Sequence, residues 1–105
     1  MIVVQRFRVA PDSAAGFRAT AEEALAVLSE QRGYVAGQLG RNVDDPALWV
    51  LQTTWEGPGA YRRALSAYAV KMRAWQLLGQ ALDEPSAYEL VRPGETLNEA
   101  RPRGI

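Results

Sequence analysis

Aromatic side chains gather in the segment WVLQTTWEGPGAYRR, residues 49–63. Trp49 and Trp55 lie six residues apart, and Tyr61 follows six residues later. Residues at even spacing along a β-strand point to the same face of its sheet, so the two tryptophans share a face if this segment is a strand. Such rings either fill a core or wall a pocket for a flat, apolar molecule. An indole N–H or a tyrosine hydroxyl at the pocket edge would donate a hydrogen bond to a substrate oxygen.

Each candidate site residue also has a simple packing interpretation. Trp55 stands at a strand end beside a GPG turn, where we favour a pocket edge over the core. Tyr61 donates to a substrate, acts as a weak base if its pKa is lowered, or packs in the core. Gln5 lies among apolar residues on one strand face, and a buried amide needs hydrogen-bond partners that a ligand would supply. Arg73 either stabilises a substrate anion or is a surface charge. The remaining candidates would form an apolar wall: Leu51, Tyr68, Met72 and Trp75.

Composition excludes several kinds of active site. Without Cys in the 105 residues, disulfides, thiolate metal sites and cysteine nucleophiles are excluded. Without His, there is no Ser-His-Asp triad, no typical zinc site and no histidine-ligated haem. The 12 basic and 12 acidic residues give a net charge of zero, and therefore no long-range field for nucleic acid or anionic lipid. We expect no metal, no cofactor, no nucleic acid and no membrane partner.

Length and sequence pattern indicate a small cytoplasmic domain. A chain of 105 residues has room for one modest core, and 48% apolar with 23% charged residues is typical of globular proteins. MIVVQRFRV at the N-terminus begins in a strand-like pattern without a signal sequence. No apolar run reaches membrane-spanning length.

Hydrophobic periodicity predicts an α+β, ferredoxin-like fold. Asp12 or Ser13 suits the start of the first helix, and the second helix is either buried over a wide arc or broken near Ala69. Gly37 and Gly40 suggest a bulge or bend in the second strand. The order β-α-β-β-α-β predicts a four-stranded antiparallel sheet with both helices on one face. We expect strands at 2–9, 34–42, 48–56 and 86–91, and helices at about 12–32 and 60–82.

The other face of this sheet predicts a partner. Ile2, Val4 and Val50 would lie there in water over a wide area, and the simplest cover is a second copy, sheet against sheet. We therefore expect a homodimer. Residues 1–92 would form the domain. The tail, residues 93–105, lacks periodicity and is either disordered or packed on the partner subunit.

The segment GYVAGQLGRNVDDPALWVLQTTWEGPGAY, residues 33–61, resembles the antibiotic biosynthesis monooxygenase family. The marks are a Gly-aromatic step after the first helix, an Asp-Asp-Pro turn, a strand ending in Trp-Glu, and an Ala-Tyr helix start. VVQRFRVAPDSAAGF near the N-terminus extends the resemblance over about residues 1–91. The resemblance implies a dimeric α+β barrel.

Two activities follow from the resemblance, and the first fits poorly. Haem-degrading members use an Asn on the first strand, a Trp on the second helix and an axial His. Here Gln5, Ala64 and Ala74 stand in those places, so haem degradation by that mechanism is disfavoured.

The second activity is that of the cofactor-independent, anthrone-type oxygenases of aromatic polyketide pathways. This chain resembles them at Trp55 and Tyr61, but Leu51 replaces the Asn expected four residues before the Trp. An electron-rich phenolate or enolate can give one electron to triplet oxygen, so the protein must deprotonate the substrate, stabilise its anion and exclude water. We expect a cofactor-independent monooxygenase for a flat aromatic or polyketide-type molecule. The alternatives are a non-catalytic ligand-binding or stress-related module, and a polyketide cyclase.

Overall fold

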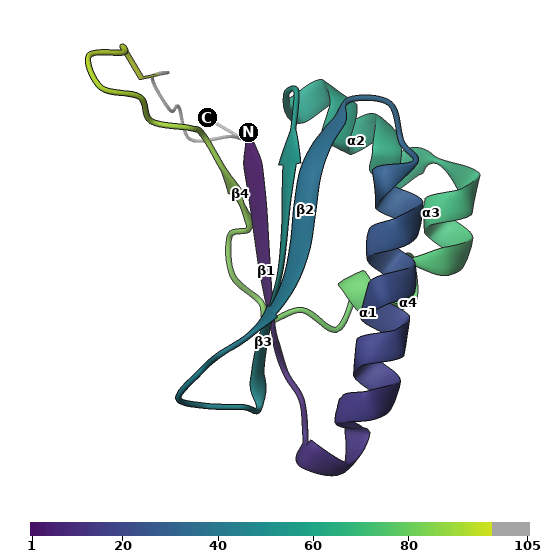
Figure 1. The fold of residues 1–105 in the computed structure, drawn as a ribbon. Coiled ribbons are helices and arrows are strands. Elements are labelled where there is room, and N and C mark those ends of the chain that lie inside the picture. The colour runs from purple at the N-terminus through teal and green to yellow at the C-terminus, as the bar shows by residue number, and fades with distance from the viewer. Residues whose placement is uncertain (98–105) are drawn as a thin grey trace.

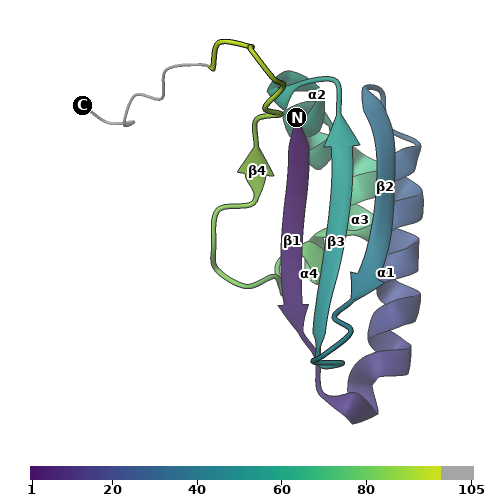
Figure 2. The same cartoon turned by 60° about the vertical axis from the view of Figure 1, so that its left-hand side comes forward.

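In the computed structural model, which describes residues 1–97, every helix lies on one face of a four-stranded antiparallel sheet (Figures 1 and 2). The strand order is β2-β3-β1-β4, which confirms the expected α+β, ferredoxin-like architecture. The elements are β1 (Ile2–Arg8), the 3-10 helix η1 (Pro11–Ser13), α1 (Ala14–Ser29), β2 (Tyr34–Arg41), β3 (Leu48–Trp55), α2 (Pro58–Ser66), α3 (Tyr68–Arg73), α4 (Trp75–Leu78) and β4 (Ala87–Tyr88).

The central strand β3 is buried at every second residue, as the pleat of a strand covered on one face requires. Phe7 of β1 lies opposite Trp49, and Gln5 lies opposite Leu51. Tyr34 of β2 pairs with Trp55 at the other end of the strand. The β3 residues that face the helices are Trp49, Leu51, Thr53 and Trp55.

The irregularity in β2 lies at a different place from the one expected. The register with β3 shifts between Tyr34 and Ala36, that is, at Val35 and not at either glycine. Gly37 is needed for space instead, because a Cβ there would lie 2.5 Å from the Tyr34 hydroxyl and 2.8 Å from a methyl of Leu25. Packing against α1 therefore explains this glycine.

Of the two alternatives for the second helix, the structure shows the broken one, with two breaks and three short helices. The backbone is extended at Ala67, with ψ of 137°, and departs from helical geometry at Ala74, with φ of −130°. Each break changes which side of the following turn faces the sheet. As a result the core receives a set of mostly small side chains: Ala60, Ala64, Val70, Ala74 and Leu77.

The same breaks correct the expectation that Tyr68, Met72 and Trp75 wall a pocket. These side chains are 78%, 66% and 50% exposed and lie on the side of α3 and α4 away from the sheet. The Trp75 ring is held there by a hydrogen bond from its indole N–H to the Leu65 carbonyl, 2.9 Å long. None of the three lies in the layer between sheet and helices.

The last strand is shorter than expected. β4 contains two residues, which pair with Ile2 and Val3 of β1. Leu90, Val91 and Leu97 beyond it are exposed. Most of the tail predicted at 93–105 lies outside the described residues, so its packing on a partner subunit stays a prediction. No helix within residues 1–97 has the length and apolar character needed to cross a bilayer.

Substitution of Gly33 tests the close contact between α2 and the chain just before β2. Its φ is +90°, and a Cβ there would lie 2.4 Å from the Cβ of Ala60 in α2. Left-handed backbone is costly for an L-residue, and the clash would push α2 off the sheet. We expect Gly33→Ala to lower the free energy of unfolding by more than about 1 kcal/mol, measured by chemical denaturation.

The matched control is Gly16→Ala. Gly16 lies in α1, and no atom would come within 4 Å of a Cβ there. Because Ala favours the helix over Gly, this variant should keep or raise the stability by up to about 1 kcal/mol. Equal losses in both variants would contradict the close approach at Gly33.

Candidate functional site

The layer between sheet and helices holds two groups of aromatic rings. The Trp55 cluster consists of Trp55, Tyr34 and Tyr61, with the Trp55 ring centroid 5.5 Å from each tyrosine. It lies where β3 ends and α2 begins. Trp55 is 1% exposed, and its indole N–H donates to the Thr53 hydroxyl at 2.8 Å.

The expectation of a free Trp55 N–H at a pocket edge is therefore wrong in this structure. Thr53 and Trp55 are two residues apart on the same buried face of β3, so the hydroxyl lies within reach of the indole. Thr53 was not among the candidates. Its two-residue spacing from Trp55 is the signal from which this hydrogen bond can be predicted.

Tyr61 lies against Trp55 and is partly buried. Desolvation raises the pKa of its hydroxyl above the ordinary value, so the group stays protonated near neutral pH. Tyr61 is thus a hydrogen-bond donor, and the role of a weak base with lowered pKa does not fit. Within residues 1–97 no group accepts a hydrogen bond from it.

Gln5, Leu51 and Arg73 are held in three different environments. Leu51 is 1% exposed and packs in the core. Gln5 is partly buried and lines a hollow of about 370 Å³ between β1 and residues 78–86. Arg73 forms ion pairs with Glu23 and, at 3.5 Å, with Glu30 of α1.

The Arg73 guanidinium holds the pKa of Glu23 below its usual range, chiefly through their hydrogen bond. Arg73 therefore connects α3 to α1 through these two ion pairs. The structure brings Trp55 and Tyr61 together and places Gln5 opposite Leu51, but it does not gather the predicted site into one cavity.

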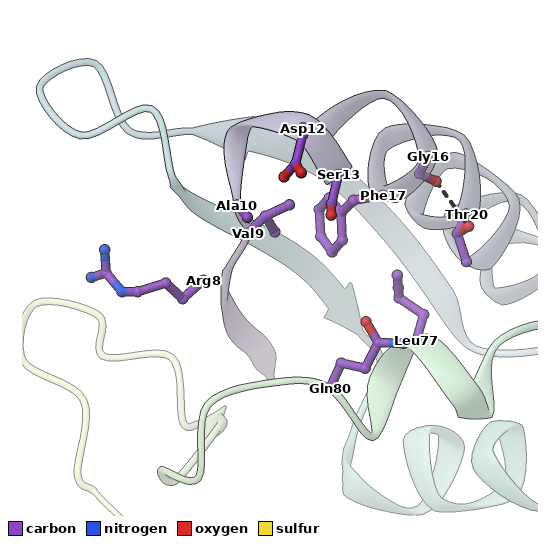
Figure 3. A pocket seen from close by; sticks show the side chains of 10 residues that line it. All are labelled: Arg8, Val9, Ala10, Asp12, Ser13, Gly16, Phe17, Thr20, Leu77 and Gln80. Carbon is purple, nitrogen blue, oxygen red and sulfur yellow. Dashed lines mark hydrogen bonds between the residues drawn. The ribbon is translucent and has the colours of Figure 1, made fainter.

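A cavity of about 550 Å³ opens at the other end of the layer, beside the start of α1 (Figure 3). We name it the Phe17 cavity. Val9, Phe17 and Leu77 give it apolar walls, and Asp12, Ser13 and Gln80 add polar groups. Its volume lies within the roughly 300–1,000 Å³ of small-molecule sites. Figure 3 shows the Phe17 ring in the middle of these side chains, with Arg8 extending away from it.

Three polar side chains at this cavity are available to a ligand. Asp12, Ser13 and Gln80 make no side-chain hydrogen bond to any residue that the structure describes. Ser13 was expected as a helix cap, but α1 begins after a 3-10 turn and Ser13 makes no side-chain capping bond. In contrast, the Thr20 hydroxyl donates to the Gly16 carbonyl at 2.9 Å, and Arg8 donates to Asp45 at 2.8 Å.

Sequence reasoning missed this cavity because it took APDSAAGF only as a helix start. Ser13, Phe17 and Thr20 are spaced so that they line one side of a helix, which is the available signal. A second cluster of rings closes the cavity from behind. The Phe7 and Phe17 centroids are 5.1 Å apart, and those of Phe17 and Trp49 are 5.3 Å apart. In the described part of the chain, no three acidic side chains are grouped as metal ligands would be.

Removing the Thr53 hydroxyl tests the hydrogen bond that it accepts from the Trp55 indole N–H. Thr53→Val keeps the shape of the side chain but leaves the buried Trp55 N–H without an acceptor. We expect the free energy of unfolding to fall by about 1–3 kcal/mol, the usual cost of a buried unsatisfied donor. Chemical denaturation followed by tryptophan fluorescence measures it.

Thr54→Val is the control on the neighbouring residue. The Thr54 hydroxyl accepts from Gln52 at 3.1 Å on the partly buried face away from the helices, where Gln52 keeps its second partner, Gln38. Its loss should change the stability by less than about 0.5 kcal/mol. A Thr53→Val protein as stable as the Thr54→Val protein would disprove the structural role of the bond.

Comparisons with known proteins agree with this architecture. The sequence profile of the antibiotic biosynthesis monooxygenase family matches residues 1–74. SnoaB from Streptomyces nogalater, a cofactor-independent oxygenase solved as a mutant, is 28% identical, with a TM-score of 0.69 over 93% of this chain and 96% of that chain. Among curated protein sequences, none matches.

Two further solved structures share the fold. Rv0793 from Mycobacterium tuberculosis is 22% identical, with a TM-score of 0.65 over 95% of this chain and 97% of its own. A conserved protein from Methanosarcina mazei Go1 is 16% identical, with a TM-score of 0.67 over 82% and 84%. Since the profile matches well over half of the sequence, this chain belongs to the antibiotic biosynthesis monooxygenase family.

Proposed function

We propose that the protein is a cofactor-independent monooxygenase that oxidises a flat aromatic or polyketide-type molecule. The observation that carries this proposal is the similarity to the cofactor-independent oxygenase SnoaB along nearly the whole of both chains. The family membership supports the reaction class. The aromatic walls of the layer between sheet and helices support a flat substrate.

The Phe17 cavity is the proposed substrate site. Its volume of about 550 Å³ accommodates a molecule of two or three fused rings. Phe17 and Leu77 contact the rings and exclude water from one side, while Ser13 and Gln80 donate hydrogen bonds to an oxyanion. Asp12 accepts the proton that the substrate loses. The Trp55–Tyr61 pair is the alternative position, because the Tyr61 hydroxyl is an uncommitted donor.

An anthrone-type substrate makes the reaction balance without a cofactor. The ring methylene gives up one proton to form the enolate, and the enolate gives an electron to dioxygen. The methylene carbon loses two hydrogens in total and gains one oxygen atom as a carbonyl. The second oxygen atom leaves as water with those two hydrogens. The protein stabilises the anion on which the electron transfer depends.

A second candidate function is a binding module without chemistry. The observations that favour it are the Trp55 N–H already bonded to Thr53 and the buried Leu51 where the family resemblance implies an Asn. Such a module binds an aromatic ligand and consumes no oxygen. The other alternative, a polyketide cyclase, needs no oxygen for its reaction and would therefore act equally well under argon.

Oxygen uptake with anthrone tests the reaction and the site together. We expect uptake that Asp12→Asn and Gln80→Leu each reduce at least tenfold in kcat/KM, because each removes a group that serves the anion. The matched control is Gln76→Leu, an exposed position on α4 that does not line the cavity. An oxygen electrode and product absorbance measure the effect.

If the substrate does not bind in the Phe17 cavity, Trp55→Phe and Tyr61→Phe test the alternative position at the Trp55 cluster. A loss of turnover in these two variants, with Asp12→Asn and Gln80→Leu unaffected, would move the site to the Trp55 cluster. Binding of anthrone without any oxygen uptake would support the module and contradict the oxygenase.

We also propose that the protein is a homodimer. Ile2, Val4, Leu48 and Val50, each partly buried, lie on the sheet face opposite the helices, and no helix covers that face (Figure 2). Packing two such faces together would hide an apolar surface of the kind that isolated monomers rarely expose. The two sheets would then form the barrel that the family resemblance implies.

Light scattering at micromolar concentration should therefore give twice the monomer mass. Val50→Glu places a charge in the centre of this face and should shift the protein to monomer. The control is Gln38→Glu, on the same face but on the outermost strand β2. A wild-type monomer at that concentration would contradict the proposal.

A further inference from the structure

One buried hydrogen-bond donor in the core has no acceptor. The Trp49 side chain is 7% exposed, and its Nε1 is the only buried side-chain nitrogen or oxygen within residues 1–97 that lacks a partner. The other two tryptophans donate, Trp55 to Thr53 and Trp75 to the Leu65 carbonyl. Folded proteins rarely leave a buried donor unpaired, because the lost hydration is not recovered.

Trp49 lies between two hollows on opposite flanks of α1. It lines a hollow of about 350 Å³ together with Arg18 and Glu22 of α1 and Arg41 of β2. The Phe17 cavity lies on the other flank, beside Thr20. Residues two positions apart on a helix, such as Thr20 and Glu22, point to nearly opposite sides. The ring contact between Phe17 and Trp49, 5.3 Å between centroids at 61°, is thus a wall between the two hollows.

The groups around this wall suit an oxygen-bearing aromatic guest. Phe17 lines the cavity, whereas Trp49 does not line it and contacts the Phe17 ring edge to face from behind. On the far side the Arg41 guanidinium lies 5.5 Å from the Trp49 ring centroid. Arg41 and Arg18 line that hollow together with one carboxylate, Glu22, so its charged groups are mainly positive.

We propose that Phe17 moves aside when a flat aromatic molecule enters the cavity, and that Trp49 Nε1 then donates a hydrogen bond to a carbonyl or phenol oxygen of that molecule. The ligand class rests on the proposed function, while the donor is assigned from its unpaired state. The ligand gains affinity because it supplies the acceptor that the free protein lacks. Trp49 is therefore a binding residue that distinguishes oxygenated aromatics from hydrocarbons.

A rival explanation needs no ligand. The indole N–H can point at the face of the Phe17 ring and be satisfied weakly by an N–H···π contact. In that case the N–H would stay with Phe17 whatever occupies the cavity. The two explanations predict different behaviour of the same proton.

The test follows the three indole N–H signals of the 15N-tryptophan-labelled protein during titration with 1-naphthol or naphthalene. Trp49→Phe and Trp75→Phe assign the signals. With 1-naphthol we expect the Trp49 signal to move downfield as a new hydrogen bond forms, while the Trp75 signal stays in place. Naphthalene, which has no oxygen, should bind without that downfield shift.

Affinities complete the test. Trp49→Phe should weaken 1-naphthol about tenfold, the effect of losing one hydrogen bond, and leave naphthalene within about twofold. Trp75→Phe removes an indole N–H from the outer side of α4 and should change neither affinity. Phe17→Leu, which thins the wall, should raise the rate of 1-naphthol binding.

The inference is overturned if the Trp49 signal stays still at saturating 1-naphthol, or if Trp49→Phe binds 1-naphthol as tightly as wild type. It is also overturned if neither probe binds at millimolar concentration. Oxygen uptake from anthrone is measured on the same protein preparations before 1-naphthol or naphthalene is added. Uptake that persists leaves the proposed function intact, and its absence rejects that function separately.

Discussion

The one-sided burial of β3 is the constraint on which the rest of this structure depends. Because β3 is a central strand covered by helices on one face, every second side chain must lie beneath them. Its sequence places a large ring at each end of that buried row, Trp49 and Trp55, and both indole N–H groups are taken out of water. Only the Trp55 N–H has an acceptor, Thr53, two residues away on the same strand. The ends of the layer are therefore chemically unequal.

This inequality separates a structural end from an end suited to binding. At the Trp55 end, Gly33 lets Ala60 of α2 come close to the start of β2, and the tyrosines complete a packed cluster. At the Trp49 end the helices α3 and α4 are short, and the start of α1 borders an open cavity with uncommitted polar groups. The proposed oxygenase reaction calls for a site that binds an anion and excludes water, and the end beside Trp49 is the proposed position of that site.

The order and type of the elements could be predicted because periodicity is a local property of the chain. β3 is rich in β-branched and aromatic residues, which favour strands, and Phe17, Ala21 and Leu28 recur at helical spacing. The wide apolar arc of residues 60–82 allowed for a break near Ala69, and the chain does break two residues away, at Ala67. The second break, at Ala74, could not be predicted, since alanine continues a helix and only packing decides otherwise. Hydrophobicity favoured Tyr68 and Met72 for the interior, whereas the narrow space above the sheet accepts alanines. The Phe17 cavity depends on where α4 ends relative to α1, a tertiary relation that no short segment of sequence contains.

The irregular backbone of β2 bears on how the protein behaves at high concentration. β2 is the outermost strand on its side of the sheet, and a regular outermost strand offers a row of amides and carbonyls to which a foreign strand can attach. The register shift next to Val35, an exposed apolar residue, breaks the regularity of that row at one end. Ribbon-like aggregation through this side of the molecule is thereby disfavoured, whereas the proposed dimer would use the broad surface of the sheet.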